Sequence, residues 1–343
     1  MCGGKTLCRC LAASLVMLAW APLVPRDAFA ARHVAVMQYG GPIDKAAAET
    51  AAKASARRSA AQDALRSIVA RHDVRFAARV DSHADVPPDP LGLAYAVIKI
   101  QPGDISFKDL ADGSGAVSVV LDAQTPVESA AVRAALLNPE RVQLYTYAAM
   151  REQQLLAQFS IYSAAVGTAQ EPGSAAVAQL CNSMAALSLY LDILPFLEKS
   201  WLRPFDVLAA MQSAVKLDPD NPLLHSALGD ACMLLSRPHE AREAQTRALR
   251  LDAQFVRAYH GRGIACLALR LPLLALADLS EAIRLAPFTA AYRRDRAAAW
   301  LLLEKNDDMC ADLYEACALG ECEQYKWAVG QGSCEKKIPE YLN

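Results

Sequence analysis

The stretch Val256–Pro287 reads VRAYHGRGIACLALRLPLLALADLSEAIRLAP and has the spacing of two antiparallel helices. Gly263 is small at the point where the two helices would cross. Ala275 and Ala282 lie seven residues apart on one face, where a further helix could approach closely. Pro287 follows the second helix, where the missing N–H of proline is tolerated. The stretch therefore predicts a helical hairpin.

The same pattern returns 34 residues earlier and, more weakly, 34 residues later. The upstream copy keeps Gly229, Cys232, Ala241 and Ala248. The downstream copy keeps Ala297, Trp300, Leu313 and Ala316. A two-helix unit of 34 residues resembles the tetratricopeptide repeat (TPR). The resemblance covers roughly Pro222 to Gly320, and it implies stacked hairpins in which each unit covers the apolar face of its neighbour.

Some positions depart from the TPR pattern. His225 and Arg293 stand where the family has a large aromatic residue, which is the position that Tyr259 fills. Gln245 stands where the family has a large apolar residue, and Ala253 where it has proline. The departures weaken the resemblance more in the two outer units than in the middle one.

An irregular unit is expected before these three. Phe205–Pro219 looks like a second helix, and Ser174–Leu194 is a candidate for the first helix of the same unit. We therefore expect TPR-like repeats over residues 201–320. The fold class is mostly α, a TPR-like α-solenoid preceded by a small α+β domain.

The first thirty residues have the pattern of an export signal. Lys5 and Arg9 precede an apolar run, Cys10–Val24, and Ala28–Ala30 places small residues at the −3 and −1 positions of a cleavage site. A membrane anchor is the alternative, but the run is shorter than the roughly 20 residues that a span needs. We expect residues 1–30 to be removed, the remainder to be periplasmic or secreted, and no later stretch to span a membrane.

The front part, residues 31–124, predicts a small α+β domain. HVAVMQYGG alternates like a strand that ends in a turn, and residues 44–72 have the period of an amphipathic helix. Leu93–Gln101 and Ala116–Gln124 predict strands, and DVRFAARVD (73–81) could add another.

From Thr125 the helical period returns. It breaks at Asn138-Pro139, which predicts a short helix and then a long one, with Glu152 on the solvated face of the long helix. We expect residues 125–200 to connect the front domain to the repeats. A dimerising coiled coil is the alternative, although the apolar stripe is short for several heptads.

Seven cysteines follow the expected leader, and four of them, Cys310, Cys317, Cys322 and Cys334, lie near the C-terminus. Such clustering in an exported protein indicates disulfides. Cys310 and Cys317 would lie about 10.5 Å apart on one helix, which is too far for a bond. A turn at LGEC and a returning helix would bring Cys334 near Cys310 and Cys322 near Cys317. We therefore predict these two bridges, with residues 321–343 as a cap.

A zinc site of four thiolates is the alternative use of these cysteines, but the spacing lacks paired C-x2-C knuckles. The tail also resembles the cysteine-closed ends of some exported bacterial TPR proteins.

No pattern in the chain predicts catalysis. The six histidines form no HExxH motif, and the carboxylates are too scattered to nominate an acid–base pair. The serine of DGSGA lacks the strand-to-helix elbow of a hydrolase. A net charge of −2 gives no nucleic-acid footprint. We expect a protein that is not an enzyme, with no cofactor, no metal and no nucleic-acid partner.

The TPR resemblance carries an expectation about binding, because in that family the first helices line a concave groove that holds peptides or partner helices. It implies a groove formed by Ser226, Asp230, Met233, Arg257, His260, Ile264, Arg294, Ala298 and Leu301. Arg257 and Arg294 could together receive a carboxylate, or the charged residues could only keep this face soluble.

The chain is therefore expected to be a scaffold for a protein or peptide. The alternative is an envelope assembly component, a homo-oligomer that self-associates through its front domain, with the repeats as a spacer.

Overall fold

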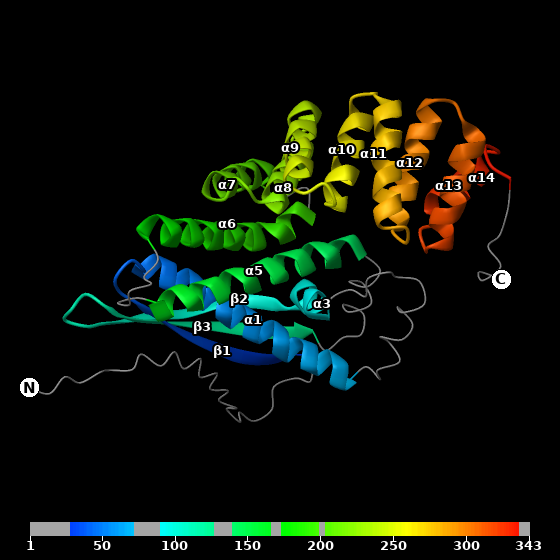
Figure 1. Ribbon diagram of the computed structural model, residues 1–343. Helices are drawn as coiled ribbons and strands as arrows, with labels where there is room; N and C mark the ends of the chain where they lie inside the picture. The colour runs from blue at the N-terminus through cyan, green and yellow to red at the C-terminus, as the bar shows by residue number, and fades with distance from the viewer. Residues whose placement is uncertain (1–27, 72–89, 127–138, 166–172, 199–202, 336–343) are drawn as a thin grey trace, which may run out of the picture. The chain divides into compact units, whose positions relative to one another are not determined.

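The computed structural model describes residues 28–71, 90–126, 139–165, 173–198 and 203–335 (Figure 1). The chain divides into two compact units, Met1–Ser188 and Leu189–Asn343. The expected leader except its last three residues, the segment DVRFAARVD and the short helix before Asn138-Pro139 lie outside the described residues.

A three-stranded antiparallel sheet forms the base of the first unit. Its strands are β1 (Ala28–Tyr39), β2 (Lys99–Asp109) and β3 (Gly115–Pro126), in the order β1-β3-β2 (Figure 1). The turn between β2 and β3 contains Gly113 at a φ of 81°, a backbone conformation that glycine adopts without strain. The strand predictions for β1 and β3 and the turn prediction for ADGSGA are confirmed.

Helix α1 (Lys45–Arg71) packs on one face of this sheet, against β1 and β3. Asp44 caps its N-terminus, because the Asp44 Oδ1 accepts a hydrogen bond from the Ala47 N–H at 2.7 Å. Ala48, Ala51 and Ala52 are fully buried. Alanine combines a high helix propensity with a small side chain, so the helix can lie close to the sheet.

The strand expected over Leu93–Gln101 is wrong in its first half. Pro90–Val97 is a helix, α3, and the strand begins only at Lys99. Ala94, Tyr95, Ala96 and Val97 are buried, and α3 packs against α1 and against α5 (Pro139–Ala165). A short apolar run fits a buried helix as well as a strand, and only these contacts decide between them.

Helix α5 packs on α1 and α3, so it is part of the first unit. The expectation that Glu152 lies on its solvated face is wrong, since this side chain is 3% exposed. Its Oε1 accepts a hydrogen bond from Arg57 Nη1 at 3.0 Å, and its Oε2 accepts one from the Tyr95 hydroxyl. A buried carboxylate thus joins α1, α3 and α5.

The second unit contains three successive helical hairpins (Figure 1). Their helices are α8 (Pro222–Leu234) with α9 (Pro238–Leu251), α10 (Val256–Ala268) with α11 (Pro272–Leu285), and α12 (Ala290–Leu302) with α13 (Asn306–Ala318). Each hairpin contacts the next, with α7 (Pro204–Leu217) packed on α8 and α14 (Glu323–Gly330) on α13. The mostly α, TPR-like solenoid after a small α+β region is confirmed.

The three hairpins turn in the same way. Ser236, Arg270 and Glu304 lie at the ends of the first helices with φ values of 56°, 58° and 58°. They are 34 residues apart, so the left-handed conformation repeats with the unit although none of the three is glycine. The second helix then begins two residues later, at Pro238, Pro272 and Asn306.

Two departures from the TPR pattern are compensated in the structure. His225 Nε2 lies 2.8 Å from the carbonyl oxygen of Pro219, and Arg293 Nη1 donates to the carbonyl oxygen of Pro287. Both prolines lie two residues after the last residue of the preceding second helix. A polar side chain therefore ties the start of a unit to the end of the unit before it, where the family uses an aromatic residue.

Helix α6 (Ser174–Glu198) spans the boundary between the units. Of the described helices, it alone is long and apolar enough over Ser174–Leu194 to cross a membrane, and half of that segment is buried. Length and composition of this kind also occur in a core helix of a soluble protein. The expectation of no span beyond the leader stays a prediction.

Replacing Glu152 with alanine should destabilise the first unit strongly. The change leaves the Arg57 guanidinium, whose side chain is 13% exposed, without its carboxylate, and such losses typically cost about 3 kcal/mol or more. Hydrogen exchange of peptides from α1, α3 and α5 measures the effect. The exposed Gln154→Ala on the same helix is the control, and equal protection in both variants would contradict the role of Glu152.

The stability of the first unit should fall below neutral pH because of His33. Burial lowers the pKa of His33 from 6.5, although the Asp63 carboxylate acts in the opposite direction. A histidine with a lowered folded pKa stabilises the fold above pH 6.5, and this contribution is lost as the pH falls through the folded value, by up to about 1.4 kcal/mol per pH unit. Hydrogen exchange of β1 and α1 at pH 7 and below should show this loss in the wild type and a smaller one in His33→Gln.

Candidate partner-binding surface

The candidate binding surface is the side of the repeats formed by the first helices α8, α10 and α12, which contact one another in series. Equivalent residues recur at intervals of 34 along them and form columns. We call these columns the first-helix face. They are Leu223–Arg257–Ala291, Ser226–His260–Arg294, Asp230–Ile264–Ala298 and Met233–Leu267–Leu301.

The charged residues of the first-helix face pair with one another across successive units. Arg257 Nη2 of α10 lies 3.0 Å from Asp230 Oδ2 of α8. His260 Nε2 of α10 lies 2.7 Å from Asp295 Oδ2 of α12. Arg294 contacts both Asp295, at 2.9 Å, and Glu321, at 2.8 Å. Side-chain pairs therefore connect each unit to the next and the last unit to the cap: two are ion pairs of arginine with carboxylate, and His260 with Asp295 is a hydrogen bond between them in the row.

The expectation that Arg257 and Arg294 together receive an incoming carboxylate stays a prediction, and these pairings weigh against it. Each guanidinium already contacts a carboxylate of its own chain. Ser226 and His260, which were also expected to line the groove, are buried at 1% and 8% exposure. In the structure Ser226 is packed in the interior of the repeats, and His260 contacts Asp295 of the next unit.

Asp295 is the centre of the network that joins the second unit, the third unit and the cap. Burial raises the pKa of its carboxyl group, but the hydrogen bonds from His260 and Arg294 outweigh burial, so the pKa of Asp295 lies below its usual value of 3.8. The carboxylate is therefore charged at neutral pH and holds two cationic or polar partners. No sequence motif points to this site, because Asp295 has no charged equivalent in the other units, where Ala227 and Gly261 stand.

The apolar residues form the remaining part of the first-helix face. Met233, Ile264 and Leu267 are partly exposed, Ala298 is exposed, and Leu301 is exposed at 51%. All five lie in the later turns of their helices, and Asp230 is the charged residue at the level of Ile264 and Ala298. The surface therefore offers a partner apolar contact, and the exposure is greatest at the third unit.

Gln245 explains how the first unit tolerates a polar residue at an apolar position. It is fully buried on α9, and its Nε2 donates to the Ser226 carbonyl at 3.0 Å and to Asp230 Oδ1 at 3.2 Å. Gly229 and Gly261 make room for it, since a Cβ at either glycine would lie 2.6 Å or 2.4 Å from Gln245 Nε2. Gln245 therefore orients the carboxylate that pairs with Arg257.

A second set of ion pairs lies inside the hairpins. Arg262 Nη2 contacts Asp278 Oδ1 at 2.6 Å in the second unit, and Arg296 Nη2 contacts Asp312 Oδ1 at 2.6 Å in the third. The arginine and the aspartate both recur after 34 residues, so the sequence itself contains the signal from which this pair could have been predicted. The first unit has Leu228 and Ala244 at these positions.

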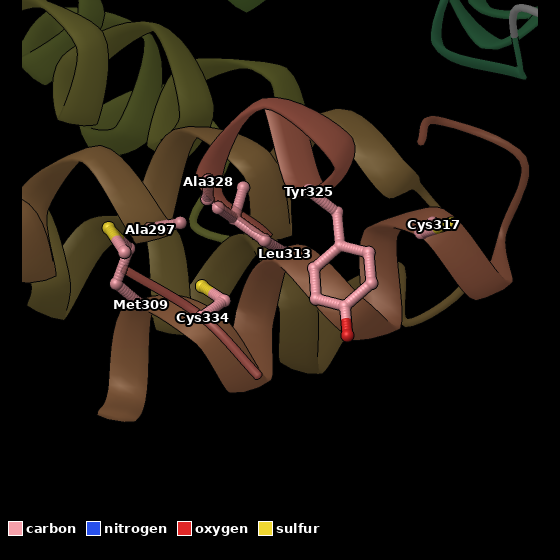
Figure 2. Close-up of a cluster of buried hydrophobic side chains, with 7 residues drawn as sticks. All are labelled: Ala297, Met309, Leu313, Cys317, Tyr325, Ala328 and Cys334. Carbon is pink, nitrogen blue, oxygen red and sulfur yellow. The ribbon is translucent and has the colours of Figure 1, made fainter. Parts of the chain in front are cut away.

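The cap covers the last hairpin. Ala297, Met309, Leu313, Cys317, Tyr325, Ala328 and Cys334 form a buried cluster between α12, α13, α14 and the tail (Figure 2). Cys310 is bonded to Cys334 and Cys317 to Cys322, which are the two predicted pairs. The four sulfur atoms are thus used by disulfides, not arranged as a zinc site. The cap replaces the next repeat that α13 would otherwise need.

The remaining described cysteines do not suggest chemistry. Cys232 and Cys266 are buried at equivalent positions of α8 and α10, and burial raises the pKa of both thiols. A raised pKa disfavours the reactive thiolate. Within the described ranges, no group of three or more His, Cys, Asp or Glu side chains could hold a metal ion.

Comparison with known proteins adds one structure. No protein-family model matches the chain, and no curated protein matches it. A similar solved structure is the crystal structure of MamA protein, with 14% sequence identity and a TM-score of 0.34, covering 59% of this chain and 92% of that one. A likeness of this extent says nothing about what the chain binds, and the fold assignment rests on the helices and their contacts.

Replacing Asp295 with asparagine should destabilise the repeats by about 2 kcal/mol at neutral pH, since charged hydrogen bonds to His260 and Arg294 are lost. A lowered folded pKa means that the contribution exists above pH 3.8 and disappears as the pH falls through the folded value. The difference in the free energy of unfolding between the wild type and Asp295→Asn should therefore become smaller at acidic pH. Denaturant titration followed by tryptophan fluorescence measures it, because Trp300 and Trp327 lie in the second unit.

The exposed Asp307→Asn on α13 is the matched control for charge. If the Asp307 and Asp295 variants lose the same stability, the network around Asp295 does not join the units.

Proposed function

We propose that this chain is an exported, non-catalytic scaffold that binds a protein or peptide partner on the first-helix face of its repeats. The observation that carries the proposal is the apolar strip of Met233, Ile264, Leu267, Ala298 and Leu301, which continues across three units and ends in a leucine that is 51% exposed. Contiguous apolar patches on a protein surface are a common feature of interaction sites, and we take this strip, partly exposed in the first two units and exposed in the third, as such a patch.

The chemistry of the strip determines the kind of partner. The neighbouring charges are already paired within the chain, so they add little attraction for a free carboxylate or phosphate. An amphipathic helix has apolar side chains at intervals of three and four residues and would cover a strip of this kind. The partner is therefore an apolar-faced helix rather than an acidic terminus.

Export is supported by the cap. The two disulfides among the described residues are stable in an oxidising compartment and would be reduced in a bacterial cytosol. The expected leader at residues 1–30 agrees with this location. We infer that the scaffold acts in the periplasm or outside the cell.

The test is selection of binders from a displayed library of random peptides on the purified, disulfide-bonded chain. Peptides bound by the wild type should share apolar residues at helical spacing. Leu301→Asp should weaken their binding by about tenfold or more, since it removes one apolar anchor and buries a charge. Fluorescence anisotropy with a labelled selected peptide measures the affinity.

The matched control is Leu273→Asp, which changes an equally apolar residue that is 70% exposed but lies on the second helix α11. It should leave binding unchanged. Peptides that ignore Leu301→Asp, or that respond equally to both variants, would show that the first-helix face is not the binding site.

A further inference from the structure

We propose that two copies of this chain associate by pairing their β1 strands, antiparallel, into one continuous sheet. This inference goes beyond the proposed function, because it concerns the first unit and uses no residue of the first-helix face. It rests on the difference between the two edges of the sheet, since the order β1-β3-β2 makes both β1 and β2 edge strands.

The β2 edge is protected against further pairing. Pro102 lies within the strand and has no N–H to donate, and the register with β3 shifts between Pro102 and Ile105. Lys108 adds an exposed charge. Proline, an irregularity and lysine are the devices by which natural proteins prevent edge strands from pairing with another chain.

The β1 edge has no proline, irregularity or lysine, and its exposed charged residue, Arg32, is paired with Asp122 of β3. It pairs with β3 without a shift at every residue from Ala28 to Tyr39, and it contains no proline, glycine or lysine. Among the described residues, its strand partner is β3 alone. A long, regular strand of this kind offers a row of N–H and C=O groups on its outer side to an additional strand.

The side chains of β1 suit a second copy of the same strand. His33 and Ala35 are buried on the side of α1, whereas Val34 and Val36 are exposed at 37% and 56% on the opposite face. Antiparallel pairing about Ala35 would place Val34 opposite Val36 of the other copy, so that four valines form one cluster. Val120 of β3 is the cross-strand neighbour of Val34 and extends that cluster.

The charges allow the same register. Arg32 would face Gln38 of the second copy, so that no like charges meet, and Arg32 already lies 3.3 Å from Asp122 of β3. An interface built from one patch on both copies closes with two-fold symmetry and stops at a dimer. Ala35 is also the midpoint of residues 31–39, the part of β1 that remains after the expected cleavage.

The first experiment measures the mass of the purified chain by analytical ultracentrifugation. The wild type should be a dimer and Val36→Lys a monomer, because a lysine at this position protects the edge. The matched control is Ser118→Lys on the central strand β3, which is the cross-strand partner of Val36 on the same face. It should stay dimeric, because edge pairing leaves that face open.

Each other outcome overturns the proposal. A monomeric wild type means that another segment, or nothing, covers the β1 edge. A dimer that survives Val36→Lys forms elsewhere in the chain, and one that is lost equally in Ser118→Lys stacks through the sheet face. None of these results bears on whether Leu301→Asp weakens peptide binding, so the two proposals are tested independently.

Cross-linking tests the register without relying on a disruptive variant. Chains with Val34→Cys are mixed with chains with Val36→Cys and oxidised. Residues directly opposite in an antiparallel pair have Cβ atoms about 5 Å apart, against about 7 Å or more for diagonal neighbours. The mixture should therefore form the 34–36 disulfide, identified by mass spectrometry, more efficiently than either variant alone. Equal cross-linking, or none, would contradict pairing about Ala35.

Discussion

The stack of hairpins depends on close contact at small residues that recur once in every unit. Ala214, Ala248, Ala282 and Ala316 are 34 residues apart, and each is at most 1% exposed. A pair of helices cannot cover its own apolar face, so each unit needs a neighbour at a fixed distance. A larger side chain at any of these positions would hold two helices apart and expose the apolar residues around it. The repeat period and the order of the helices both follow from this contact.

Once the hairpins are stacked, the charged residues between them become structural. Asp230, Arg257, His260, Asp295 and Arg294 satisfy one another across unit boundaries, with Glu321 at the end of the row. A partly buried charge needs a partner, and here the partner comes from the next unit. This use of charge leaves the apolar residues as the part of the first-helix face that a partner can contact.

The last hairpin of the solenoid and the edge strands of the sheet are protected in different ways. The solenoid ends in a disulfide-bonded cap that covers Leu313 and Met309 (Figure 2). The sheet protects β2 with Pro102 and an irregular register, whereas β1 stays regular to its end. This difference between the two edges is the physical basis for proposing self-association at β1.

The sequence by itself determined the features that depend on local spacing. These are the hairpins and their 34-residue period, the cap helix, the two pairs of bridging cysteines, and strands β1 and β3. They could be predicted because the period of a helix or strand and the residues of a turn involve only neighbouring positions of the chain.

Tertiary structure alone decided the roles of residues whose partners are distant in the chain. Glu152 is charged and fits a solvated face by its period, but Arg57 and Tyr95 bury it. Arg257 and Arg294 have the chemistry of an anion site, but Asp230 of the preceding unit contacts Arg257, and Asp295 and Glu321 contact Arg294. The run from Leu93 to Val97 is equally suited to helix and strand, and its contacts with α1 and α5 made it a helix. In each case the free energy of folding depends on which distant residue contacts the group in the tertiary structure. A short window of the sequence does not contain that information.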